Sequence, residues 1–155
     1  MSLNEELRTE QVTHLNLSNF CQAESSSPVS DVLALMRQKG SAVCLVVENG
    51  RLAGIFTERD VIQKVVSEPE TWSQPVSTVM TADPFTIRPD MGATAALVAL
   101  DEHHFRTLPV VDEDGRICGT MTHRAIIEYL ATRYPIDVLN RPPHPEQFPR
   151  KAEGG

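Results

Sequence analysis

The order of apolar and polar stretches along this chain predicts short strands and helices in alternation. In the first half, residues 29–39 predict a helix that stops before a glycine, a residue suited to a helix C-cap. An apolar run over residues 42–47 predicts a strand, Asn49-Gly50 is a strong two-residue turn signal, and residues 52–56 predict the returning strand. Thr57 follows and is a suitable N-cap for a further helix.

The second half of the chain repeats this order. It predicts a short strand after a proline, an alanine- and leucine-rich helix, a buried strand, a hairpin turn with a glycine, a returning strand and a helix that opens on a threonine. These elements cover residues 84–87, 91–103, 108–111, 112–115, 117–121 and 122–130.

A shift of 65 positions superimposes the two halves at the level of residues. The stretch Glu48–Gly54 falls on Glu113–Gly119, Thr57 falls on Thr122, and the register holds without a gap over residues 20–65. Two copies of one supersecondary unit explain this better than chance. Each copy has the order β-α-β-β-α, so the predicted fold class is α+β with two tandem repeats.

The repeat also predicts how the chain is divided. A polar stretch with two prolines separates the copies, and a proline-rich, charged stretch follows the second. The predicted parts are an N-terminal segment (1–14), repeat 1 (15–68), a linker (69–75), repeat 2 (76–134) and a mobile tail (135–155).

Charge and composition narrow the classes of function. The net charge of −7 argues against a nucleic-acid binder and against a membrane-surface protein. No apolar run reaches the roughly 18 residues of a membrane span, and the polar N-terminus does not resemble a signal peptide. The three cysteines are widely spaced and without a C-x-x-C pattern, which favours free thiols in a cytoplasmic protein.

Three motifs in a fixed order resemble those of CBS domains, the family named after cystathionine β-synthase. The run Leu108-Pro109-Val110-Val111-Asp112, followed by two glycines, resembles the central motif of the family. Gly54–Val61 resembles the ending "G-h-h-T-x-x-D-h", in which h is an apolar residue, and Val79–Pro84 resembles the opening "VMT-x-x-P". The resemblance covers residues 15–133, and it implies that the two repeats pack with pseudo-twofold symmetry.

The resemblance also implies a function. CBS pairs form two clefts between their repeats that often bind adenosyl ligands such as AMP, ADP, ATP or S-adenosylmethionine, and the pairs commonly dimerise. We therefore expect a regulatory module that responds to such a ligand by a conformational change, forms a homodimer and acts on a separate target protein. We expect no required cofactor and no enzymatic activity, because no nucleophile, base and oxyanion donors assemble in a pattern. The alternative is a ligand-free dimerisation or scaffold module.

Asp60 is the centre of the predicted site. A carboxylate accepts both hydroxyls of a ribose, and Thr57, three residues earlier, lies on the same side of the first helical turn. Taken alone, threonine followed three residues later by an acid is typical of a helix capping box. The resemblance to CBS domains shifts the interpretation toward a ligand.

The other predicted ligand contacts come from both repeats. In the family, a cleft takes its ribose-binding acid from one repeat and its base-binding segment from the other. The predicted set, besides Thr57 and Asp60, is Ile55, Arg59, Thr81, Ala82, Asp83, Phe85, Thr86, Arg106, Leu108 and Pro109. Ile55 and Leu108 are equally explained as ordinary core, and Arg59 as a solvated helix face. His104 is a further candidate for a phosphate contact.

The second cleft is predicted to be weak or empty. It would join Thr122 and Ala125 to residues 16–21 and 41–43, so the cap remains but the acid is missing. Adjacent His103 and His104 point in different directions, and no acid or cysteine cluster accompanies them, so no metal site is expected.

Overall fold

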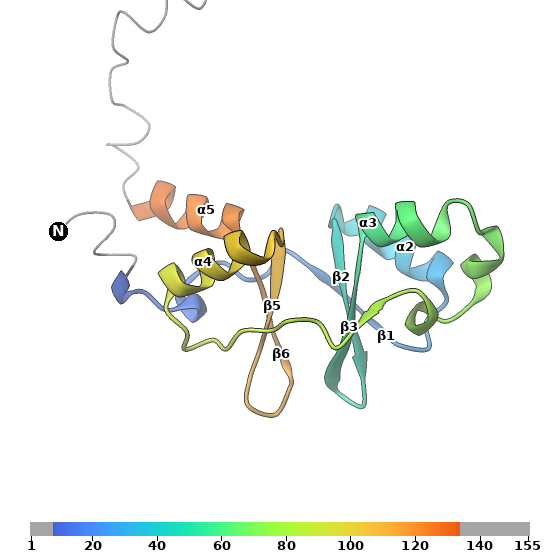
Figure 1. Ribbon diagram of the computed structural model, residues 1–155, viewed down its shortest axis with the longest axis horizontal. Coiled ribbons are helices and arrows are strands. Elements are labelled where there is room, and N and C mark those ends of the chain that lie inside the picture. The colour runs from blue at the N-terminus through green and yellow to red at the C-terminus, as the bar shows by residue number, and fades with distance from the viewer. Residues whose placement is uncertain (1–7, 134–155) are drawn as a thin grey trace, which may run out of the picture.

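The computed structural model describes residues 8–133, and the predicted tail at 135–155 lies outside them. The chain forms two lobes, each with a β-hairpin and two helical segments (Figure 1). The first lobe consists of β1 (Cys21–Glu24), α2 (Val29–Lys39), β2 (Val43–Glu48), β3 (Arg51–Thr57), α3 (Glu58–Asp60) and the π-helical segment η2 (Val61–Val65).

The second lobe follows two short 3-10 turns, η3 (Pro69–Ser73) and η4 (Val76–Thr78). It consists of β4 (Thr81–Ala82), α4 (Ala93–His103), β5 (Thr107–Val111), β6 (Ile117–Thr122) and α5 (His123–Arg133). A further 3-10 turn, η1 (Val12–His14), precedes both lobes. The predicted α+β class and the order of elements are confirmed.

Both hairpins use the turns that their sequences favour. Asn49 and Gly50 have φ of 54° and 78°, the pair of positive values that a type I′ turn requires. In the second turn, the carboxylate of Asp112 accepts hydrogen bonds from the N–H groups of Asp114 at 2.9 Å and Arg116 at 3.0 Å. The hydrogen bond from the Arg116 N–H, and to a smaller extent that from the Asp114 N–H, lowers the pKa of Asp112 below its ordinary value.

The helices of both lobes lie on one side of the molecule, and the hairpin turns point to the other side (Figure 1). Helix α2 buries Val29, Val32 and Met36 at helical spacing, and it ends at Gly40, which has a φ of 62°. The two hairpins meet near their turns, where the Leu52 N–H donates to the Gly115 carbonyl at 2.9 Å. The module therefore has one helical face and one hairpin face.

The opening segment of each repeat pairs with the hairpin of the other repeat. Strand β4 belongs to the second repeat but pairs antiparallel with β3 of the first, with Gly54 opposite Ala82 and Ile55 opposite Thr81. In the same way the Thr120 N–H on β6 donates to the Leu17 carbonyl at 2.9 Å. This exchange joins the lobes more closely than a linker alone would.

The exchange corrects one predicted strand. We expected the second repeat to open with a strand over residues 84–87, but the strand is Thr81–Ala82. The extended run breaks after Ala82 because Asp83 has a φ of 49° and Pro84 has no N–H to donate. Of the expected stretch, Ile87 alone forms a bridge, parallel to Val110 of β5.

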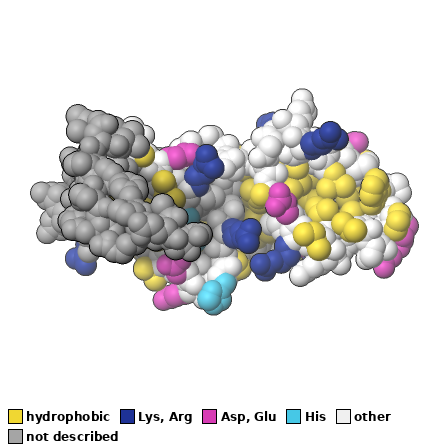
Figure 2. Space-filling model, turned by 90° about the horizontal axis from the view of Figure 1, so that it is seen from above, with side chains coloured by type: hydrophobic (Ala, Val, Ile, Leu, Met, Phe, Trp, Pro, Cys, Tyr) yellow, Lys and Arg dark blue, Asp and Glu magenta, His cyan; other side chains and the backbone are white. Residues whose placement is uncertain are grey.

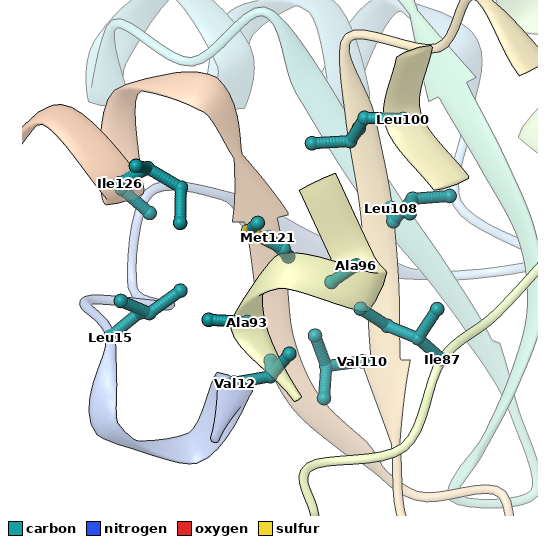
Figure 3. Close-up of a cluster of buried hydrophobic side chains, with 11 residues drawn as sticks. Val12, Leu15, Ile87, Ala93, Ala96, Leu100, Leu108, Val110, Met121 and Ile126 are labelled. Carbon is teal, nitrogen blue, oxygen red and sulfur yellow. The ribbon is translucent and has the colours of Figure 1, made fainter. Parts of the chain in front are cut away.

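Two separate hydrophobic cores support the lobes. The first contains Cys21, Val29, Val32, Met36, Cys44, Val46, Phe56, Val65, Val76 and Val79. The second contains Val12, Leu15, Ile87, Ala93, Ala96, Leu100, Leu108, Val110, Met121, Ala125 and Ile126 (Figure 3).

The segment that precedes repeat 1 packs in the core of repeat 2. Val12 and Leu15 lie against Ala93 in Figure 3, and the Val12 N–H donates to the Met91 carbonyl at 2.8 Å. The Ala93 N–H in turn donates to the Glu10 carbonyl at 2.8 Å. The predicted boundaries stay a prediction, but the packing of these residues crosses them.

Candidate functional site

Thr57 and Asp60 form a reciprocal capping box at the junction of β3 and α3. Thr57 has the extended backbone of an N-cap residue, and its hydroxyl accepts a bond from the Asp60 N–H at 3.4 Å. Asp60 Oδ2 accepts from the Thr57 N–H at 2.9 Å and from the Thr57 hydroxyl at 3.1 Å. Because Oδ2 accepts both of these bonds, this oxygen is committed to its own helix, and Asp60 as a whole is 6% exposed.

Lys64 holds the other oxygen of the same carboxylate. Its ammonium lies 3.1 Å from Asp60 Oδ1 and donates at 3.0 Å to the carbonyl of Val79. A carboxylate oxygen accepts about two hydrogen bonds, so Oδ1, with one partner, still has acceptor capacity. The pair also links the first repeat to the segment that leads into the second.

The pairing of β3 and β4 brings part of the predicted site together. Ile55, which is two residues before Thr57 on β3, lies opposite Thr81 of β4. The Asp83 N–H donates to the Ala53 carbonyl at 3.2 Å, which extends the contact beyond Ala82. Ile55, Thr57, Asp60, Thr81, Ala82 and Asp83 therefore lie on neighbouring segments from the two repeats, and we call these six residues the first junction.

The remaining predicted site residues differ in burial. Leu108 is fully buried in the second core, in agreement with the core alternative, and Pro109 is buried as well. Arg59 and Arg106 are exposed, and Thr86 is half-buried.

Phe85 contacts an aromatic cluster at the end of α4. Its ring centroid lies 4.6 Å from that of His103 and 6.3 Å from that of Phe105. His104 next to them is exposed and ends α4 with a φ of 56°. The ribose candidates Thr57 and Asp60 thus lie together, whereas Phe85 and Leu108 contact residues outside the first junction.

The residues predicted for the second cleft keep the helix cap but lack the acid and the lysine. The Thr122 hydroxyl accepts from the Ala125 N–H at 3.0 Å, so α5 keeps the cap without the acid. A shift of 65 residues places Tyr129 where the first repeat has Lys64. Asn16 donates to Glu128 at 3.2 Å, and Cys21 is buried in the first core. The pair of Asp60 and Lys64 therefore has no counterpart at the matching positions of the second repeat.

Inspection of the sequence missed Lys64 and an apolar hollow on the helical face. The spacing of four residues between Asp60 and Lys64 was the available signal, because side chains at i and i+4 meet on a helix. The hollow, of about 530 Å³, lies between α2 and α3–η2 and is lined by Leu33, Met36, Val61 and Ile62, with Arg37 and Glu58 beside them. It contains none of the residues predicted for the first cleft.

The described part of the chain is residues 8–133. Within that range, no group of three or more His, Cys, Asp or Glu side chains is placed to hold a metal ion. Among the helices of the same part of the chain, none has the length and apolar character needed to cross a membrane.

Comparison with known proteins identifies the family. Residues 18–67 and 76–132 each match the family model of the CBS domain. The chain belongs to the CBS domain family. The resemblance found in the three sequence motifs is confirmed, and the two lobes are two CBS repeats.

Curated CBS relatives match over part of their length. The CBS domain-containing protein YhcV of Bacillus subtilis is 29% identical over 89 residues, which are 57% of this chain and 64% of that protein. An inosine-5'-monophosphate dehydrogenase of Nitrosopumilus maritimus is 31% identical over 124 residues, 79% of this chain but 25% of the enzyme. The chain thus spans less than two thirds of either relative.

Solved CBS structures share the fold. CBSX2 in complex with AMP superimposes with a TM-score of 0.69 at 26% identity, over 79% of this chain and 97% of that one. The cytosolic domain of the Mg2+ channel MgtE in complex with ATP superimposes with a TM-score of 0.66 at 25% identity, over 78% of this chain and 49% of that one. The tandem CBS architecture of the chain is therefore established.

Proposed function

We propose that this CBS pair is a regulatory module that binds an adenosyl ligand at the first junction. Asp60 would accept the ribose hydroxyls, and β4 would supply backbone contacts to the base. Binding would change how the two repeats sit against each other, and a separate protein would respond to that change. The proposal assigns no catalytic step to the chain.

One observation carries this proposal: the Thr57–Asp60 pair lies beside the opening strand of the other repeat. Ile55 and Thr81 are strand partners, so a ligand that contacts Asp60 would meet both repeats. The known complexes of CBSX2 with AMP and of the MgtE domain with ATP support an adenosyl ligand by similarity.

The geometry of Asp60 sets a condition on binding. The residue is 6% exposed and both oxygens have partners, so ribose hydroxyls would use the remaining capacity of Oδ1 or displace Lys64 from it. The bonds from Thr57 on Oδ2 belong to the helix cap and would stay. Binding therefore needs at most a rearrangement of the Lys64 side chain and leaves the helix cap in place.

Substitution of Asp60 tests the proposal. In D60N the amide keeps the shape but loses the charge, and since a hydrogen bond to a charged group contributes about 1.5–3 kcal/mol, AMP or ATP affinity should fall roughly tenfold to hundredfold. Calorimetric titration gives the dissociation constants, and a thermal melt of the unliganded variant shows how much the cap has lost.

A matched control removes an exposed acid from the other repeat. Asp101 pairs with His123 at 3.1 Å on the surface, so D101N should bind as the unaltered protein does. Equal affinity of D60N and the unaltered protein would disprove the site. If no member of an adenosyl ligand panel raises the melting temperature, the module does not bind such ligands.

A second candidate function is self-association, alone or together with ligand binding. The helical face exposes Ile62 by 71% and Val66 by 63%, and Figure 2 shows an apolar patch over the first lobe. The shift of 65 residues places Ile127, 64% exposed, where the first repeat has Ile62. We propose that a second copy of the chain covers this face.

A further inference from the structure

Lys64 is the one partner of the Asp60 carboxylate that can leave without loss of the helix cap. Its side chain is 39% exposed, whereas that of Asp60 is 8% exposed. The other partner is Thr57, whose backbone N–H and hydroxyl are fixed by the capping box. A lysine ammonium on a flexible four-carbon stem can move toward a nearby anion at small cost.

A phosphate near Asp60 would require such a cation. A carboxylate repels a phosphate within a few ångströms, and the repulsion is strong where water is partly excluded. Lys64 neutralises Asp60 by direct contact at 3.1 Å, and the 5′-phosphate of a nucleotide is attached to the ribose that Asp60 would hold. Without Lys64, this buried acid would favour uncharged or cationic adenosyl ligands.

The second repeat gives an internal comparison. It has Ala125 and Tyr129 at the two matching positions, and its helix α5 is a regular α-helix. In the first repeat the chain becomes π-helical over Val61–Val65, the segment that contains Lys64, and the Val66 N–H donates to the Val61 carbonyl at 2.9 Å. Short π-helical segments are rare and occur frequently at functional sites. The acid Asp60, its partner Lys64 and the π-helical segment thus occur together in the first repeat.

We propose that Lys64 is the residue that selects phosphorylated nucleotides at the first junction. The inference rests on the proposed function, since it concerns the same adenosyl site. The ammonium binds Asp60 and the Val79 carbonyl. On binding it turns to the phosphate, so AMP binds more tightly than adenosine or S-adenosylmethionine.

The experiment measures AMP and adenosine binding by calorimetry in the unaltered protein and in K64Q. Loss of one charge-assisted contact should weaken AMP binding by about tenfold or more, while adenosine affinity changes by less than about twofold. K64R, which keeps the charge, should keep most of the preference for AMP. K39Q, which removes an exposed lysine at the end of α2, controls for net charge and should bind both ligands normally.

The outcomes separate this inference from the function on which it rests. If the unaltered protein binds none of the ligands, the proposed function fails. If K64Q loses affinity for AMP and adenosine equally, or for neither, the site stands and the selecting role of Lys64 is overturned. Should K64Q not fold, the unaltered protein still tests the inference. If it binds S-adenosylmethionine as tightly as AMP, the inference is contradicted.

Discussion

At the scale of single residues, two glycines permit the exchange of opening segments. A Cβ added at Gly54 would collide with Met80 Sδ and lie 2.9 Å from the Thr81 carbonyl oxygen. At Gly119, the matching position of the second repeat, an added Cβ would collide with the backbone and side chain of Leu17. The glycines of the motif are thus explained by close approach of the other repeat.

Substitution of Gly54 by alanine should therefore destabilise the protein. Overpacking of this kind costs about 1–3 kcal/mol, which a denaturant titration of G54A would measure. Because Met80 is the nearest obstacle, the same substitution should cost less in an M80A background. A G54A variant as stable as the unaltered protein would mean that β4 does not pair closely with β3 as described.

At the same scale, the spacing of Thr57 and Asp60 predicts local structure better than it predicts a ligand role. The spacing of Thr57 and Asp60 correctly indicated a capping box, and the ligand role stays a prediction. The partner Lys64 was not singled out, since an i, i+4 pair of opposite charge is common on helix surfaces. Its second contact, with the Val79 carbonyl 15 residues away, needs the fold to be known.

At the scale of elements, short apolar segments far apart in sequence complete each lobe. The 3-10 turn η1 (Val12–His14) places Val12, which is fully buried, in the core of the second repeat. It lies next to α4 through the backbone bonds of Val12 to Met91 and of Ala93 to Glu10. The second lobe is therefore incomplete without residues that precede the first.

Truncation of Val12 tests this packing. V12A removes two buried methyl groups and leaves a small cavity, so the free energy of unfolding should fall by about 2 kcal/mol. T13A, at an exposed neighbouring side chain, should change it by less than about 0.5 kcal/mol. Chemical denaturation compares the two, and equal stability of both variants would contradict the packing of η1.

At the scale of the whole molecule, pseudo-symmetry gives one face with matching apolar positions on both repeats. Leu33 and Val98 match each other, as do Ile62 and Ile127, and the last three are between 46% and 71% exposed. The helices that carry them lie on the same side in Figure 1. A face with internal twofold symmetry suits an isologous contact with a second copy.

Introduction of a charge on this face tests the proposed dimer. The unaltered protein should be dimeric by light scattering after size-exclusion chromatography, and I62E should be monomeric, because a buried unpaired carboxylate opposes association. I127E should act likewise on the other repeat. Q63E adds the same charge at the exposed neighbouring residue and should remain dimeric; a monomeric unaltered protein would refute the interface.

The sequence by itself determined the repeat, the order of elements and the turns. These depend on local patterns, namely the period of apolar residues, Asn49-Gly50 and the threonine caps, and each is confirmed by the structure. Tertiary structure alone decided that each opening segment pairs with the hairpin of the other repeat and that Val12 completes the second core. It also placed Lys64 between Asp60 and Val79. Such contacts join residues distant along the chain, and no local preference of either partner specifies which distant residue it meets.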